Sequence, residues 1–307
     1  MLTSAQQNDL TDKVEFDHLT TLRIDAHHHL WNFRADEFPW LNESMEVLRR
    51  DFNVADLHEA MKTAHIGAAI AIQARQSIEE TSWLLDCADS TDKLCAVVGW
   101  APLLARELSS ILDRFAARSK LVGLREIVQD EPDGYLDQRV FDHGITELTN
   151  RGLAYDLLVR EKQLEEAIRF VDRHPHQRFV LDHAAKPRIA DREIEPWRHH
   201  ILALGQRGQV FCKLSGLVTE AEWSHWTLET LRPYLDVCVE AFGPHRLMVG
   251  SDWPVCLVAS TYSNWWGILS EYFAPFTETE RQRIFGGTAI ESYKLALALL
   301  PTVEFSS

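Results

Sequence analysis

Hydrophobic residues recur along this chain in eight short runs that are rich in Val, Ile, Leu and Ala. The runs span residues 22–28, 68–74, 95–101, 121–128, 153–159, 178–184, 210–216 and 247–253. Short apolar runs of this kind are typical of buried strands. Between them lie stretches such as VADLHEAMKTAHI and LRPYLDVCVEAF, in which apolar residues return at helical spacing. The pattern therefore predicts eight strand–helix units.

Alternating strands and helices predict an α/β fold with a parallel sheet, because near-continuous hydrophobic strands are buried on both faces. Eight such units in 307 residues fit a single (β/α)8 TIM barrel. A doubly wound open sheet would share the alternation, but its GxGxxG motif after the first strand is absent. No linker rich in Pro, Gly or Ser divides the chain. We therefore expect an N-terminal arm (1–21), one barrel domain (22–300) and a tail (301–307).

Composition narrows the class of partner. The formal net charge is −15, which disfavours binding to nucleic acid or to anionic membranes. The five cysteines are widely spaced without a CxxC motif, a pattern that fits reduced thiols better than disulfides or a structural zinc cluster. No secretory signal and no apolar stretch long enough to cross a bilayer are present. We expect a cytoplasmic protein with neither nucleic-acid nor membrane partners.

Reactive polar residues gather at the C-terminal ends of the predicted strands, where TIM barrels place their catalytic groups. In strand order these residues are His27–His29, Gln73, Arg125, Asp156, His183, Lys213 with Ser215, and Asp252 with Trp253. Buried polar groups are costly unless they are paired. A ring of them around one end of a barrel therefore indicates a functional site.

The three consecutive histidines divide by strand geometry. Side chains alternate along a strand, so His27 and His29 point the same way and His28 points to the opposite face. We interpret the pair as site residues that face the barrel axis. His28 is then a structural residue on the side of the helices.

The motifs IDAHHHLWNF, LREIVQDEPDGY, FVLDHAAKP, CKLSGLVTEA and GSDWPVC resemble those of the amidohydrolase superfamily, and most closely its sugar-lactonase branch of L-fuconolactonases and L-rhamnonolactonases. The resemblance extends over about residues 22–295. It implies an amidohydrolase-type barrel. It also implies a carbohydrate-metabolism hydrolase that cleaves the ester bond of a sugar-derived lactone, such as L-fuconolactone, to the free aldonic acid.

The resemblance also bears on metals. Metal-dependent relatives bind metal through the HxH pair and the strand 8 Asp, together with a Lys or Glu on strand 4 and a His on strand 5. Here those last two positions carry Arg125, which cannot ligate a metal, and Asp156. A binuclear centre is therefore excluded, and we expect that no cofactor is required. A single divalent cation such as zinc remains chemically reasonable; its ligands would be His27, His29 and Asp252, with His183 as a fourth.

The same resemblance assigns roles. Asp252 is expected to act as the general base that takes a proton from water, although an Asp in an SDWP turn also serves as a helix N-cap. His27, His29, His183 and Arg125 are the candidate donors to the carbonyl oxygen. Arg125 could instead form a salt bridge at the barrel mouth, and His183 a hydrogen bond in the core.

A sugar ring needs hydrogen-bonding partners and a flat apolar wall. We expect Gln73 and Asp156 to bind hydroxyls, and Trp31 and Trp253 to stack on the ring. Lys213 and Ser215 either contact the substrate or fill a layer of the barrel.

Three other functions stay open. One is a metal-dependent hydrolase or decarboxylase with one divalent ion on His27, His29 and Asp252, and another is a generic esterase. The third is a non-catalytic barrel that binds a sugar acid. No GxSxG motif is present, which disfavours a covalent acyl-enzyme. Tryptophan-rich helices near the C-terminus, with Trp265 and Trp266, leave a homodimer open.

Overall fold

Eight parallel strands form the centre of the molecule. The computed structural model describes residues 22–301, so the expected arm (1–21) and residues 302–307 of the expected tail lie outside the described residues. The strands pair in sequence order, which confirms the predicted TIM barrel. They are β1 (Ile24–His28), β2 (Ala68–Ile72), β3 (Leu94–Gly99), β4 (Leu121–Glu126), β5 (Ala154–Leu157), β6 (Phe179–Leu181), β7 (Val210–Leu214) and β8 (Leu247–Val249).

The barrel closes just beyond the end of β8. The backbone N–H of Asp252 donates to the carbonyl of His27 at 2.8 Å, and the N–H of His29 donates to the carbonyl of Trp253 at 2.6 Å. His28 and Trp253 form the corresponding parallel bridge. Because closure pairs the first strand with the last, the sheet keeps no free edge at the site.

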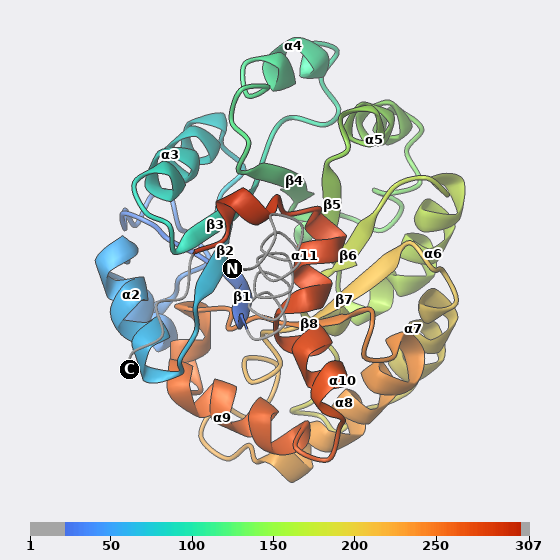
Figure 1. The fold of residues 1–307 in the computed structure, drawn as a ribbon. Helices are drawn as coiled ribbons and strands as arrows, with labels where there is room; N and C mark the ends of the chain where they lie inside the picture. The colour runs from blue at the N-terminus through green and yellow to red at the C-terminus, as the bar shows by residue number, and fades with distance from the viewer. Residues whose placement is uncertain (1–21, 302–307) are drawn as a thin grey trace, which may run out of the picture.

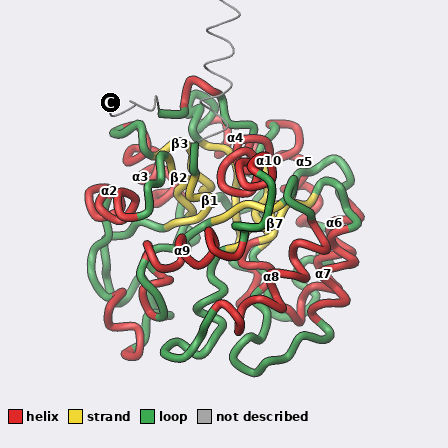
Figure 2. Tube along the Cα trace, turned by 60° about the horizontal axis from the view of Figure 1, so that its bottom comes forward, coloured by secondary structure: helices red, strands yellow, loops and turns green. Residues whose placement is uncertain are grey.

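The helices surround the strands, as Figures 1 and 2 show from two directions. They are α2 (Val54–Thr63), α3 (Ile78–Asp89), α4 (Leu108–Asp113), α5 (Val140–Arg151), α6 (Leu164–Arg173), α7 (Trp197–Gly205), α8 (Leu228–Phe242), α9 (Tyr262–Tyr272), α10 (Glu278–Gln282) and α11 (Thr288–Tyr293). Polar N-cap residues mark the beginnings of several helices. The side chains of Asn53, Ser77 and Thr227 accept hydrogen bonds from backbone N–H groups in the first turns of α2, α3 and α8.

Two apolar cores hold the fold together. The larger lies between the sheet and the helices. The smaller fills the barrel with residues such as Ile24, Ile70 and Met248, together with Ala289 and Tyr293 of α11. Accordingly, α11 lies across the barrel in Figure 1. One end of the barrel is thus plugged, and the carboxyl ends of the strands remain for a site.

The predicted strand runs extend past the observed strand ends. β6 ends at Leu181 and β8 at Val249, whereas the hydrophobic runs continue to residues 184 and 253. The residues that follow β6, Asp182–Ala185, form a short turn, η4. The side chains at these positions are therefore set by loop geometry and not by the pleat of a strand.

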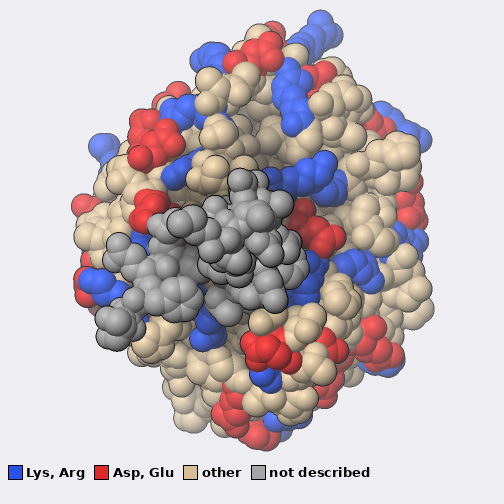
Figure 3. All heavy atoms as spheres, in the orientation of Figure 1, with Lys and Arg blue, Asp and Glu red and all other residues tan. Residues whose placement is uncertain are grey.

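Charges of both signs are interspersed on the face shown in Figure 3. Many are paired between a helix and a neighbouring loop: Arg207 contacts Asp172 of α6 at 2.8 Å, and Arg169 of α6 contacts Asp137 at 2.8 Å. Within residues 22–301, no helix is both long and apolar enough to cross a membrane. Trp265 and Trp266 are buried inside the chain, so they do not support the homodimer surface that the sequence left open.

We predict that the buried ring of His28 makes the stability of the fold sensitive to acid. Its ring is fully buried, and burial lowers its pKa to about 3. An unfolded His takes up a proton near pH 6.5, so the stability from the neutral ring is present above about pH 6.5 and is lost as the pH falls toward 3. Between pH 6.5 and about 4.5 this group alone should cost roughly 2 kcal/mol of unfolding free energy.

Urea unfolding of His28→Leu at several pH values tests this prediction. The variant should lose clearly less stability on acidification than the wild type. His176→Leu, at an exposed histidine, is the matched control and should follow the wild-type curve. Equal acid sensitivity in His28→Leu and the wild type would contradict the prediction.

Candidate active site

A β-bulge in β1 directs two histidines to the barrel axis. Asp25 pairs with Ala69 of β2, but the next pair is His28 with Ala71, so β1 contains one extra residue at this point. Ile24 and Ala26 belong to the core inside the barrel, and strict alternation from them would turn His27 outward. The bulge instead brings the rings of His27 and His29 together.

Three histidines surround the carboxylate of Asp252. Its Oδ1 lies 3.7 Å from Nε2 of His27, 3.4 Å from Nε2 of His29 and 4.0 Å from Nε2 of His183. All four residues are buried. Gly216 gives this group room, because a Cβ at that position would come within 2.6 Å of Nδ1 of His183 and 3.0 Å of Oδ2 of Asp252. The structure thus brings four of the five predicted catalytic residues into one cluster.

The charges of this cluster follow from burial. Desolvation lowers the pKa of His27 well below its usual value and that of His183 to about 4. Burial alone would raise the pKa of Asp252, but its contacts with His183 and His29 outweigh burial, so this pKa is lowered. At neutral pH a carboxylate therefore faces the uncharged rings of His27 and His183. Such a carboxylate can accept a proton from water.

The orientation of His29 is fixed by the backbone. Its Nδ1 lies 2.9 Å from the carbonyl oxygen of Ile72, which can only accept. Nδ1 therefore carries a proton, and Nε2 of the neutral ring presents a lone pair toward the centre of the site. The Nε2 of His27 lies 3.2 Å away and can donate to it.

Arg125, the fifth predicted catalytic residue, is held at the floor of the site. Its Nη1 donates to Oδ2 of Asp182 at 2.9 Å and lies 3.4 Å from Nε2 of His27. Asp182 also contacts the ammonium of Lys213 at 3.0 Å. Arg125 therefore forms a salt bridge, to Asp182, as the alternative interpretation expected. Arg125 also lines the cavity above the histidines.

The turn after β6 is strained. Four consecutive residues, His183 to Lys186, adopt left-handed backbone conformations with φ of 53°, 48°, 60° and 52°. Each costs roughly 1–2 kcal/mol for a residue with a Cβ. A hydrogen bond from α7 stabilises the turn: Nε1 of Trp197 donates to the carbonyl of Ala184 at 2.7 Å. Strain of this kind collects at functional sites, and here the turn supplies two residues to the cavity.

A cavity of about 350 Å³ opens above this cluster. His29, Arg125, His183 and Asp252 line it close to the strand ends. Its remaining lining comes from loops and includes Trp40, Arg160, Lys186, Glu220 and Trp223. The space, the carboxylate and the cationic groups together can accommodate a small polar molecule.

The predicted substrate-binding residues lie around this cavity and do not line it. Gln73 is buried and accepts a hydrogen bond from Nη2 of Arg125 at 3.2 Å. Trp31 packs edge-on against Phe52, and so does Trp253. Asp156 lies inside the barrel, where the hydroxyl of Tyr293 and the ammonium of Lys213 contact it. Their positions favour support of the site over contact with a ligand.

The loop residues of the cavity were not predicted. Lys186 lies in FVLDHAAKP and Glu220 in CKLSGLVTEA, two of the motifs that carry the resemblance, and Trp40 lies in FPWL, a further short motif of it that follows IDAHHHLWNF. A search of those motifs for charged and aromatic residues beyond the strand ends would have found them. Trp223 and Arg160 had no comparable signal, because loop conformation alone brings them to the cavity.

One divalent cation fits the cluster. Nε2 of His27, Nε2 of His29 and a carboxylate oxygen of Asp252 lie within 4.8 Å of one another. Their separations of 3.2, 3.4 and 3.7 Å are close to the roughly 3.3 Å between ligands that zinc bonds of about 2.0 Å produce in a tetrahedron. The carbonyl of Ile72 orients His29 as such a ligand requires. Arg125, 3.4 Å from His27, opposes a cation.

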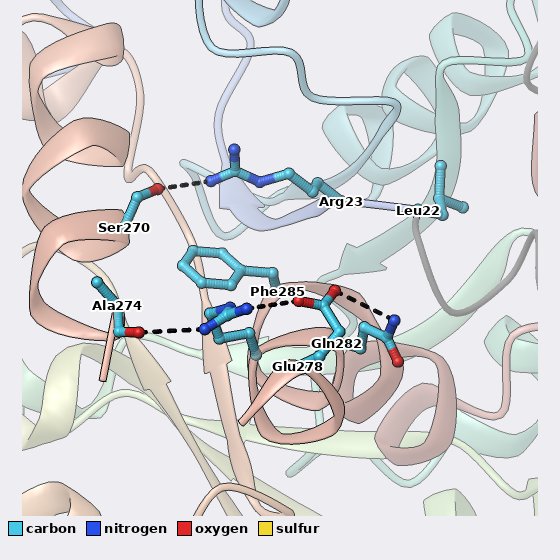
Figure 4. A pocket seen from close by; sticks show the side chains of 8 residues that line it. Leu22, Arg23, Ser270, Ala274, Glu278, Gln282 and Phe285 are labelled. Atoms are coloured by element: carbon cyan, nitrogen blue, oxygen red, sulfur yellow. Dashed lines mark hydrogen bonds and ion pairs between the residues drawn. The ribbon is translucent and has the colours of Figure 1, made fainter. Parts of the chain in front are cut away.

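A second cavity, of about 400 Å³, lies between α9 and α10 (Figure 4). Its charged groups are engaged within the protein. Arg23 donates to Ser270 at 3.0 Å, and Arg281 donates to the carbonyl of Ala274 at 3.1 Å. Within residues 22–301 no histidine lines it, and the carboxylate of Glu278 is paired with Arg281. Despite its size it does not offer the chemistry of the first cavity.

Comparison with known proteins is consistent with this geometry. The amidohydrolase family profile matches residues 24–295. An L-fucono-1,5-lactonase of Burkholderia multivorans is 40% identical and covers 89% of this chain and 96% of its own length. An L-fucono-1,5-lactonase of Burkholderia ambifaria is 34% identical and covers 90% and 96%. A crystal structure of an amidohydrolase from Burkholderia multivorans with bound zinc is 40% identical, with a TM-score of 0.87 and coverage of 90% and 100%.

Proposed function

This chain belongs to the amidohydrolase family, and from that premise we propose that it hydrolyses the ring ester of an L-fuconolactone-like sugar lactone to the free aldonic acid. The observation that carries the proposal is the buried carboxylate of Asp252 among three histidines. Two L-fucono-1,5-lactonases that align over nearly their whole length supply the substrate class and favour a six-membered ring.

In the proposed mechanism the substrate carbonyl lies above the histidines. Asp252 takes a proton from a water molecule, and the resulting hydroxide attacks the carbonyl carbon. Arg125 and a ring N–H of His183 or His27 stabilise the negative oxygen of the tetrahedral intermediate. When the ring C–O bond breaks, the protonated Asp252 returns its proton to the leaving oxygen. The products are a hydroxyl group and a carboxylic acid, which then releases its proton to the solvent as a carboxylate forms.

No metal is required in this mechanism, because Arg125 supplies a fixed positive charge beside His27 and Asp252 supplies the base. When a divalent cation is bound by His27, His29 and Asp252, it would polarise the carbonyl and lower the pKa of water. A zinc-dependent hydrolase is therefore the second candidate. The bound zinc of the Burkholderia multivorans structure favours it.

Chelation separates the two candidates. We expect acid release from L-fucono-1,5-lactone to persist, within about twofold, after extended treatment with a strong chelator, because base and cation are both side chains. The assay follows acid release across a panel of sugar lactones, with metal content measured before and after treatment. Loss of activity on chelation with recovery on adding zinc would establish the second candidate.

The same assay addresses the remaining alternatives. A generic esterase would hydrolyse a phenyl ester as well as a lactone, whereas the proposed enzyme should not. A non-catalytic barrel would bind the sugar acid and release no acid from any lactone. Absence of turnover throughout the panel would reject the proposed function.

A further inference from the structure

We propose that Lys186 and Glu220 together bind hydroxyl groups of the lactone ring and determine which sugar lactone is accepted, an inference that rests on the proposed function. The two residues come from different loops of the barrel mouth. Lys186 ends the left-handed turn after β6, and Glu220 lies in the loop after β7. Both line the cavity above Asp252.

The pair is close but not joined. Nζ of Lys186 lies 3.7 Å from Oε1 of Glu220, which is an ion-pair contact beyond hydrogen-bonding distance. Their side chains are 19% and 22% exposed, so both are largely withdrawn from water. Among the described residues, neither side chain has another ion-pair partner. Each therefore keeps its hydrogen-bonding groups available to a ligand.

Other charged residues of the cavity are engaged. Arg160 donates to the carbonyl of Gln129 at 3.3 Å and contacts Asp130 at 3.4 Å. Arg125 is bonded to Asp182 at 2.9 Å. Lys186 and Glu220 thus differ from these arginines, because among the described residues neither side chain forms a hydrogen bond and their mutual contact is 3.7 Å long.

Both residues are held in place by the backbone. Lys186 follows three residues that also have positive φ, and its N–H donates to the carbonyl of His183 at 2.8 Å. The carbonyl of Glu220 accepts from the N–H of Ala190 at 2.9 Å, which ties the two loops together. The positions of the pair are therefore built into the fold, and the strain in the turn is the cost of placing Lys186 there.

The chemistry of the pair matches a sugar hydroxyl. An ammonium only donates and a carboxylate only accepts, whereas a hydroxyl does both. One hydroxyl, or two on adjacent carbons, can accept from Lys186 and donate to Glu220 across the 3.7 Å gap. Trp223, from the same loop as Glu220, adds an apolar wall to the cavity. A ring without hydroxyls would leave both charges desolvated and unpaired, which penalises its binding.

The test compares Lys186→Met and Glu220→Gln on two substrates, L-fucono-1,5-lactone and the unsubstituted six-membered lactone δ-valerolactone. Charged hydrogen bonds contribute about 1.5–3 kcal/mol, so kcat/KM for the sugar lactone should fall on the order of 10- to 100-fold. For δ-valerolactone it should not fall, because this ring has no hydroxyl that could bond to either side chain. Where wild-type turnover of δ-valerolactone is too slow to measure, its inhibition constant against the sugar lactone provides the same comparison.

Lys162→Met is the matched control, because Lys162 forms an ion pair of similar length, 3.6 Å to Asp133, in exposed positions. It should leave both substrates unaffected, and thermal unfolding checks that every variant is folded. Equal losses on both substrates, or no loss on the sugar lactone, would overturn the inference. A wild-type protein that releases no acid from any sugar lactone would instead reject the proposed function, so the two failures are distinguishable.

Discussion

Asp252→Asn should lower kcat for sugar-lactone hydrolysis by about 10³-fold, with little change in KM. The carboxylate is the proposed general base, and such groups contribute roughly 10²–10⁴ to a rate. Asn keeps the shape of the side chain and tolerates the positive φ of 56° at this position. The backbone N–H that closes the barrel by donating to His27 is also retained. The loss should therefore be chemical and not a failure to fold.

The measurement is steady-state acid release after chelation, so that a change in metal binding does not contribute. Asp133→Asn, at a carboxylate whose side chain is 83% exposed, is the control and should retain wild-type activity. A variant Asp252→Asn that keeps more than a tenth of wild-type kcat would contradict the assignment of Asp252 as base.

Lys213→Met should destabilise the fold by about 3–5 kcal/mol, the usual cost of breaking a buried ion pair. The ammonium is fully buried and contacts Oδ2 of Asp156 at 2.5 Å and Oδ1 of Asp182 at 3.0 Å. Methionine fills the space but leaves two buried carboxylates with one cation fewer. Burial already raises the pKa of Asp156 to about 6 against the pull of Lys213, so this carboxyl should take up a proton in the variant.

Urea unfolding at neutral pH measures this effect. Lys162→Met, which removes an exposed ion pair with Asp133, should cost no more than about 1 kcal/mol. A loss of less than 1 kcal/mol in Lys213→Met would show that the buried pair does not hold the barrel together. Activity is a second readout, because Lys213 lies 3.4 Å from Nδ1 of His27.

The fold could be predicted from the sequence because its signal is local and repeated. Each buried strand needs its own run of apolar residues, and each covering helix needs its own stripe of apolar residues. The eight strand–helix units can therefore be recognised in the sequence without any tertiary information. All eight predicted strands are present in sequence order. The predicted runs were too long after β6 and β8, because they included the turn residues that carry His183 and Asp252.

The sequence by itself determined the barrel, the ring of polar residues at the strand ends and the grouping of His27, His29, His183 and Asp252. Only the tertiary structure decided how these groups are oriented and what surrounds them. The bulge in β1 reverses the alternation that the neighbouring apolar residues imply. Packing inside the barrel places Asp156 of β5 beside Lys213 of β7, 57 residues away, and beyond the cavity lining. Loop conformation brings Lys186 to Glu220. Such contacts join residues far apart in the chain, and no local pattern encodes which loops meet.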